Sequence, residues 1–89
     1  MLILRRVVGD SMLPSYTPRS FIIGIKAKKI KIGDVVIANL NSRNVLKRIT
    51  RIKDSMIYIE GDNPDYSTDS RQHGPIYRAD IIGKVIFKL

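Results

Sequence analysis

The sequence predicts a small, mostly β domain built on a coiled or barrel-like antiparallel sheet, and three observations lead to this. Short runs rich in Ile, Val, Tyr and Phe, which pack well on a pleated surface, alternate with turn residues. No stretch of 11 or more residues shows a clear 3.6-residue apolar period without a turn cluster. The 89 residues contain no internal repeat or linker-like segment, so one domain over residues 1–89 is expected.

The expected strands follow one another with a turn signal between each pair. They are Leu2–Val8, Phe21–Lys26, Val35–Leu40, Val45–Ile52, Met56–Glu60 and Ile81–Phe87. The breaks between them are rich in Gly, Pro, Asn and Asp, which favour tight turns. A helical turn is expected after Ser11 or within Asp65–Arg71, and no long helix. Five or six short strands also fit an OB-like or SH3-like barrel, so the fold class alone does not settle the function.

The composition excludes several chemistries. The absence of cysteine excludes disulfides, thiolate metal sites and cysteine nucleophiles, and a single histidine, His73, excludes a His-rich metal site. The net charge of +8 favours nucleic acid, an anionic membrane surface or acidic substrates as partners. The apolar runs are far shorter than the ~18–20 residues of a membrane span. The start of the chain lacks the order of a signal peptide, so a soluble chain is expected.

The segment Gly9-Asp10-Ser11-Met12-Leu13-Pro14 follows a predicted strand and ends in a proline. Proline fixes its own φ near −65° and keeps the residue before it out of the helical region. The segment therefore presents the hydroxyl and backbone N–H of Ser11 from a rigid corner. An ordinary surface turn has the same composition.

Lys47 lies between two apolar residues that share its face of a predicted strand, Val45 and Ile49. Burial on that face lowers the pKa of a lysine, because burial disfavours the ammonium form. A general base near neutral pH needs a pKa of about 7–8 in place of ~10.4, which is roughly 3–5 kcal/mol. The alternative is an edge-strand lysine whose amine reaches water.

The loop Gly61–Arg71 is dense in hydroxyls, carboxylates and turn-forming residues. Its acidic spacing does not match a twelve-residue calcium loop, and the closing glutamate is missing, so no metal site and no cofactor is expected. A long turn held by Asx and Asp–Arg contacts is the simpler interpretation of this loop taken alone.

Taken together and in this order, the three segments resemble the signature of the signal peptidase I family of Ser/Lys serine proteases. The matching residues are Ser11-Met12-Leu13-Pro14, Lys47-Arg48, Gly61-Asp62-Asn63 and Ser67-Thr68-Asp69-Ser70-Arg71. The run Asp69–Ile76 and the later Ile82–Val85 also resemble the small proteases that trim the N-terminal extension of nickel superoxide dismutase. The resemblance implies a signal peptidase–LexA-type catalytic core.

The resemblance also implies roles for single residues. Ser11 is the expected nucleophile, and a neutral Lys47 is the general base. The N–H of Ser11 contributes to the oxyanion hole, Ser67 orients the lysine amine, and Met12 packs beneath the substrate cleft. The implied ion pairs near the site are Asp69 with Arg71 and Asp62 with Arg48.

This chain departs from the family at several points. Some members supply a second oxyanion donor from a serine two residues before the nucleophile, where this chain has Gly9, so a hole with a single or backbone donor is implied. Ser15 stands where the family often has Thr. We expect this chain to have neither the membrane-spanning N-terminus of signal peptidases nor the large extra β domain of some bacterial members.

The leading function is limited proteolysis, with a protein precursor that carries an N-terminal signal or pro-peptide as substrate. A soluble, cytoplasmic location is favoured, and peripheral membrane association is the alternative. Cleavage of its own chain by a LexA-type domain is not expected, since only ten residues precede Ser11 and they hold no Ala-Gly or Cys-Gly pair. A basic nucleic-acid-binding barrel is the non-enzymatic alternative, but the six aromatic residues form no basic–aromatic motif. His73 is left out of the expected site.

Overall fold

A computed structural model describes residues 1–26 and 28–89 of the chain. These residues form one seven-stranded sheet in which every neighbouring pair is antiparallel, so the predicted mostly β fold is confirmed. The strands are β1 (Leu2–Arg6), β2 (Phe21–Ile25), β3 (Val35–Leu40), β4 (Arg43–Lys53), β5 (Met56–Glu60), β6 (Ile76–Tyr77) and β7 (Ile81–Lys88). The short helices are η1 (Pro64–Tyr66), α1 (Ser70–His73) and η2 (Arg78–Asp80).

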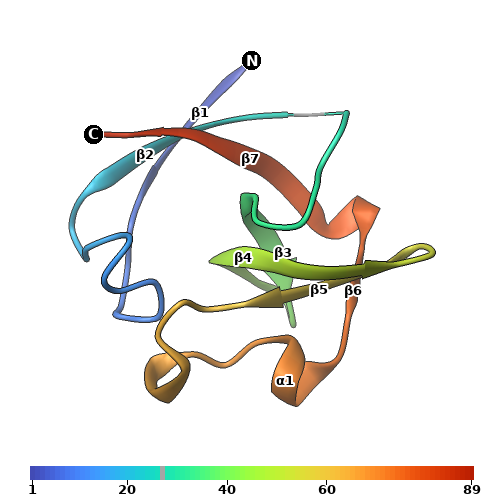
Figure 1. Cartoon of the computed structure of the whole chain (residues 1–89). Helices are drawn as coiled ribbons and strands as arrows, with labels where there is room; N and C mark the ends of the chain where they lie inside the picture. Colours follow the sequence, from blue (N-terminus) through green and yellow to red (C-terminus); the bar gives the residue numbers. More distant parts are fainter. Residues whose placement is uncertain (27) are drawn as a thin grey trace.

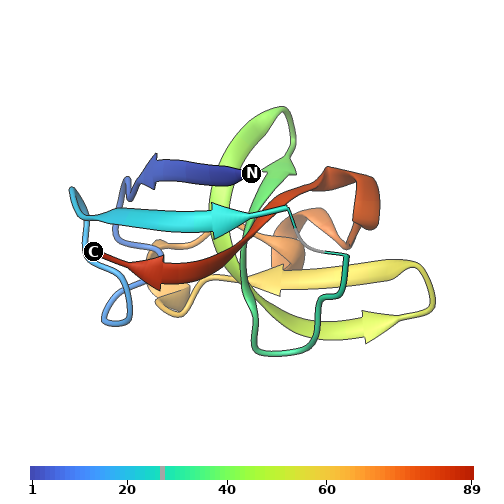
Figure 2. The same ribbon diagram turned by 90° about the horizontal axis from the view of Figure 1, so that it is seen from above.

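The sheet is coiled and not flat (Figures 1 and 2). Its strand order is β1-β2-β7-β3-β4-β5-β6, so β7 joins the first two strands to the middle of the sheet. The ladder shifts at three places, between Ile23 and Gly24, between Ile37 and Ala38, and between Ile49 and Arg51. Such irregularities increase the local twist of a sheet. The coil brings the end of β1 near the beginning of β4.

The core lies on both faces of β3. Its alternating residues Val36, Ala38 and Leu40 pack into one apolar cluster, while Ile37 packs into a second. The first cluster is completed by Ile49, Ile57, Ile59 and Ile76. The second is completed by Ile3, Val7 and Ile22. A strand buried on both faces reads as a nearly continuous apolar run, which explains why β3 has the bounds expected from the sequence.

Two tight turns set the length of β4. Asn41 and Ser42 both have positive φ, of 53° and 66°, as a two-residue type I′ hairpin requires. The hairpin lets β4 start at Arg43, two residues earlier than expected, and Asp54, with a φ of 56°, turns the chain into β5. The early start is important because it adds Arg43 to the strand that carries Lys47.

The remaining differences concern short elements. Strand β6 has only two residues and was not expected, and α1 lies partly outside the segment expected to be helical. The residues after Ser11 form turns and not a helix, with the N–H of Tyr16 donating to the carbonyl of Met12 at 2.9 Å. The Leu13–Pro14 peptide bond is cis. None of the described helices is long and apolar enough to span a membrane.

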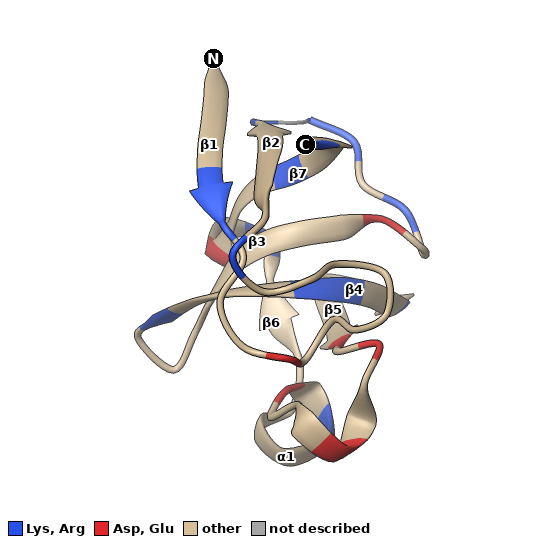
Figure 3. Cartoon of the chain, turned by 90° about the vertical axis from the view of Figure 1, so that its left-hand side faces the viewer, with Lys and Arg blue, Asp and Glu red and all other residues tan. Residues whose placement is uncertain are grey.

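Charged residues are unevenly placed. Figure 3 shows basic residues along β1, β4 and β7, whereas acidic residues lie mainly in the loops, including those beside α1. The charged side chains of the sheet are thus mostly Lys and Arg, whereas the loop between β5 and α1 is acidic. The three sequence motifs meet where this loop packs against the sheet.

Candidate active site

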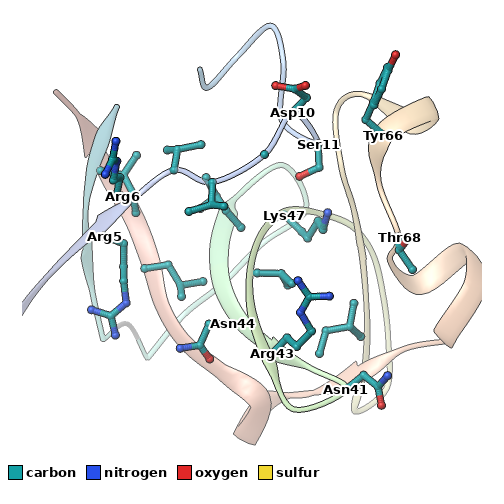
Figure 4. A pocket seen from close by; sticks show the side chains of 18 of the residues that line it. Arg5, Arg6, Asp10, Ser11, Asn41, Arg43, Asn44, Lys47, Tyr66 and Thr68 are labelled. Atoms are coloured by element: carbon teal, nitrogen blue, oxygen red, sulfur yellow. The ribbon is translucent and has the colours of Figure 1, made fainter. Parts of the chain in front are cut away.

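A cavity of about 410 Å³ lies between the end of β1 and the beginning of β4 (Figure 4). Both walls include strand edges without a pairing partner in the described sheet. Strand β1 pairs with β2 alone, and residues 43–47 of β4 pair with β3 on one side, because pairing with β5 begins only at Arg48. The cavity is thus bordered by backbone N–H and C=O groups that an extended peptide can pair with.

Ser11 enters this cavity from the segment that follows β1. Gly9 has a φ of 78°, a left-handed conformation that favours glycine, and there the chain turns away from the direction of β1. Met12, only 1% exposed, anchors the segment in the interior. Among the described residues, the N–H of Ser11 donates to no backbone carbonyl, so this donor remains for another acceptor.

Lys47 faces the same cavity from β4, and Figure 4 shows it beside Ser11. Its side chain is buried, with 4% of the residue exposed, and it lies across from Val36 on β3. Burial lowers the pKa of Lys47, and the charge of Arg71 adds to this, while the charge of Asp69 acts in the opposite direction. The net effect is a pKa of Lys47 below its ordinary value.

Ser67 lies between Lys47 and the nearest carboxylate. The Nζ of Lys47 donates to the Oγ of Ser67 at 2.8 Å, and that Oγ donates to Oδ2 of Asp69 at 2.5 Å. Because the one hydroxyl proton of Ser67 is used on Asp69, its oxygen is left to accept from the lysine. No carboxylate of the described residues lies within 4.0 Å of the Nζ of Lys47.

Asp69 is fully buried and has five hydrogen-bond donors. Besides Ser67, it accepts from the side chain of Arg71 at 2.9 and 2.6 Å, from the N–H of Gly61 at 2.8 Å and from the N–H of Arg71 at 3.1 Å. Burial by itself raises the pKa of Asp69, but these bonds outweigh it and hold the pKa well below its ordinary value. Asp69 is therefore a fixed anion that orients Ser67.

Gly61 and Asn63 hold the two halves of the site together. A Cβ on Gly61 would lie 2.6 Å from both the carbonyl oxygen of Ser11 and the Cβ of Ser67, so only glycine allows these segments to approach. The N–H of Asn63 donates to the carbonyl of Ser11 at 2.9 Å, and its side chain donates to the carbonyl of Asp10 at 3.0 Å. Sequence reasoning gave neither residue a role.

Arg48 projects from the face of β4 opposite to Lys47. Its guanidinium makes two hydrogen bonds of 2.8 Å to the carboxylate of Asp62 and a third, also 2.8 Å, to the carbonyl of Gly33. The hydrogen bond to Asp62 raises the pKa of Arg48, and the same contact lowers the pKa of Asp62. This pair ties the loop after β5 to the sheet from outside the cavity.

The cavity also has lining residues that the sequence did not single out. His73, which we left out of the expected site, lines it, as do Tyr66 and Thr68. At the far end Arg5 and Arg43 border it. Arg43 could have been predicted, since it has the same strand parity as Lys47. No cluster of three His, Cys, Asp or Glu side chains able to hold a metal ion occurs in the described part of the chain.

Comparison with known proteins gives two matches. Residues 1–86 match the model of a family described as Peptidase S24-like. Mitochondrial inner membrane protease subunit 1 of Xenopus tropicalis is 42% identical over 45 residues, which cover 51% of this chain and 27% of that protein. The chain thus aligns with about a quarter of the length of this relative.

Proposed function

The chain belongs to the Peptidase S24-like family, and from that premise we propose that it is a serine endopeptidase whose nucleophile is Ser11 and whose general base is Lys47. The observation that carries the proposal is the environment of Lys47. Its amine is buried, faces a cavity together with Ser11, and bonds to a hydroxyl and not to a carboxylate. A lysine in such an environment is poised to accept a proton.

The first step is attack on the scissile peptide bond. Neutral Lys47 donates one N–H to Ser67, which leaves its lone pair for the proton of the Ser11 hydroxyl. As the proton moves to Lys47, the Oγ of Ser11 attacks the carbonyl carbon of the substrate. The carbonyl oxygen becomes an oxyanion, and the N–H of Ser11 is the donor that this chain offers to it.

The second half of the reaction returns the enzyme to its starting state. The tetrahedral intermediate collapses as the C–N bond breaks, and the ammonium of Lys47 gives its proton to the leaving amine. An ester between Ser11 and the acyl part of the substrate remains. Water then attacks the ester carbonyl, with Lys47 accepting the water proton. As the second tetrahedral intermediate collapses, the ammonium of Lys47 returns that proton to the Oγ of Ser11, the C–O bond to Ser11 breaks, and the carboxylic product is released.

The substrate we propose is a protein precursor with an N-terminal signal or pro-peptide, from which the enzyme removes the extension by limited proteolysis. The unpaired edges of β1 and β4 suit an extended peptide, which adds to such edges by main-chain hydrogen bonds. Met12 is buried beside Ser11, and in this proposal it fills the space beneath the substrate and keeps the pocket there shallow. Small residues just before the scissile bond are therefore expected.

Mass-spectrometric profiling of a diverse peptide pool tests this function. We expect cuts by the wild type that follow small residues and that disappear in both Ser11→Ala and Lys47→Ala, a loss of at least about 10³-fold in rate. Circular dichroism and thermal unfolding check that both variants stay folded. Cuts that persist in either folded variant would contradict the proposed dyad, whereas a preference for large residues would contradict the shallow pocket.

The soluble, cytoplasmic location stays part of this proposal. Cell fractionation of the tagged chain tests it, with recovery in the soluble fraction as the expected result. Recovery with membranes that is reversed by high salt would favour the peripheral alternative, because salt weakens attraction between a basic protein and anionic lipids.

A further inference from the structure

One end of the cavity carries a set of arginines that the proposed chemistry does not use. Arg5, Arg6 and Arg43, here called the arginine rim, border the cavity away from Ser11 (Figure 4). Arg43 lies on the same face of β4 as Lys47, and Arg5 shares the face of β1 that carries the buried Ile3 and Val7. Their strand positions thus direct both side chains inward along the walls of the cavity.

The arginine rim differs from the other arginines of the site in its partners. Arg48 and Arg71 are each bonded to a carboxylate, whereas no carboxylate of the described residues lies within 4.0 Å of Arg5, Arg6 or Arg43. Within the described residues, the guanidinium of Arg5 donates only to the carbonyl of its neighbour Leu4, at 3.1 Å. The rim therefore brings together three positive charges without an ion-pair partner among the described residues, and such a concentration attracts anionic groups.

We propose that the arginine rim is a specificity site for an acidic side chain of the substrate. This inference rests on the proposed peptidase function. Arg43 lies four positions before Lys47 on β4, a distance of about 13 Å at ~3.3 Å per strand residue. An extended peptide beside β4 has a similar rise, so the rim reaches a Glu or Asp about three to five residues from the scissile bond. Because the rim lies at one end of the cavity, the preference falls on one side of that bond.

Paired peptides test this site. Starting from a peptide found by profiling, Glu and Gln are compared at each position three to six residues on either side of the cut. We expect kcat/KM to be about tenfold higher for Glu than for Gln at one or two positions on one side only, with about a threefold loss of that ratio in Arg5→Gln or Arg43→Gln. The double variant brings the ratio near one, because the Glu peptide loses its advantage over the Gln peptide.

A matched control removes two charges elsewhere. Lys29 and Lys53 are exposed and do not line the cavity, so Lys29→Gln combined with Lys53→Gln keeps the Glu preference. A charge reversal sharpens the result, since Arg43→Glu is expected to favour Lys over Glu at the same peptide position. The preference also weakens in 0.5 M salt.

The outcomes separate this inference from the proposed function. Ser11-dependent cleavage with equal rates for Glu and Gln peptides, or a preference that survives in the double variant, overturns the rim and leaves the peptidase intact. If no peptide is cleaved, the peptidase proposal fails, and NMR titration of the wild type with Glu and Gln versions of one extended, small-residue peptide decides on the rim. Tighter binding of the Glu peptide, with shifts at the Arg5 and Arg43 side chains, supports it, and equal or absent binding refutes it.

Discussion

Two neighbouring basic residues on β4 have opposite surroundings. Lys47 points inward, is buried and bonds to a hydroxyl, whereas Arg48 points outward, is about one third exposed and bonds directly to Asp62. The pKa of Lys47 is lowered by burial, and the pKa of Arg48 is raised by its carboxylate. The alternation of side chains along the strand thus separates a buried lysine, our proposed base, from an arginine in a partly solvated ion pair.

The difference teaches how a carboxylate can orient a lysine without charging it. Asp62 touches Arg48 directly, but Asp69 reaches Lys47 only through the hydroxyl of Ser67. A carboxylate in direct contact would favour the ammonium, because an opposite charge stabilises the protonated form. The intervening hydroxyl weakens that effect while it still fixes the position of the amine.

Asp69→Asn has the largest expected effect on stability. The variant leaves Arg71 and the N–H of Gly61 without their anion in the interior, and removing one partner of a buried ionic network costs about 3 kcal/mol of unfolding free energy. Denaturant unfolding measures this loss. Asp65→Asn, at an exposed position of the same loop, is the matched control, with an expected change within about 0.5 kcal/mol.

The pH dependence of the unfolding free energy tests the same role of Asp69 in a second way. The pKa of Asp69 is lower in the folded chain than the ~3.9 of an unfolded one, so its contribution to stability is present above about pH 4 and is lost as the pH falls further. Asp69→Asn should flatten that acid-induced loss in part, since Asp62 also has a lowered pKa. An unchanged slope would mean that Asp69 is not held as an anion.

Lys47→Met is expected to stabilise the chain while it abolishes cleavage. The methionine fills a similar volume, and Ser67 keeps its bond to Asp69, so the variant gains about 1–2 kcal/mol near pH 7. In the wild type, the unfolded lysine binds more protons than the folded one between the lowered pKa and ~10.4, so stability rises with pH across that window. The stability advantage of Lys47→Met over the wild type therefore shrinks as the pH rises, and thermal unfolding at several pH values measures it. An advantage that stays constant or grows with pH would contradict the prediction.

The Arg48–Asp62 pair should show the smallest effect. A double-mutant cycle with Arg48→Met and Asp62→Asn is expected to give a coupling of about 1 kcal/mol, because the pair is partly solvated, and to shrink in high salt. A coupling energy as large as the stability loss in Asp69→Asn would mean that the partly exposed Arg48–Asp62 pair and the buried network of Asp69 do not differ in their contribution to stability.

The sequence predicted most of the sheet, because apolar β-rich runs and turn residues are local signals. Strands β3 and β5 have the expected bounds, whereas β6 carries too few residues to show a pattern. Helix α1 was hard to predict for the same reason, since four residues cannot show a helical period. The one-domain organisation stays a prediction.

The site was predicted only as three separate segments. Motif order and the inward position of Lys47 are visible in the sequence, but its distance to Ser67 depends on how the loop after β5 folds back onto β4. Gly61 is needed because it lies close to the carbonyl of Ser11, and Asn63 bonds to the carbonyl of Asp10. Both contacts join segments some fifty residues apart in the sequence. Arg5 looks like any solvated charge until the coiled sheet brings it to the cavity.

The central claim is that burial keeps Lys47 neutral near physiological pH, and NMR titration of the lysine side chains measures this without a substrate. We expect Lys47 to titrate below the ~10.4 of a free lysine, because burial lowers its pKa. The pH dependence of kcat/KM should rise through the same pH range as the Lys47 titration. A Lys47 that titrates at or above the ~10.4 of a free lysine would contradict the account.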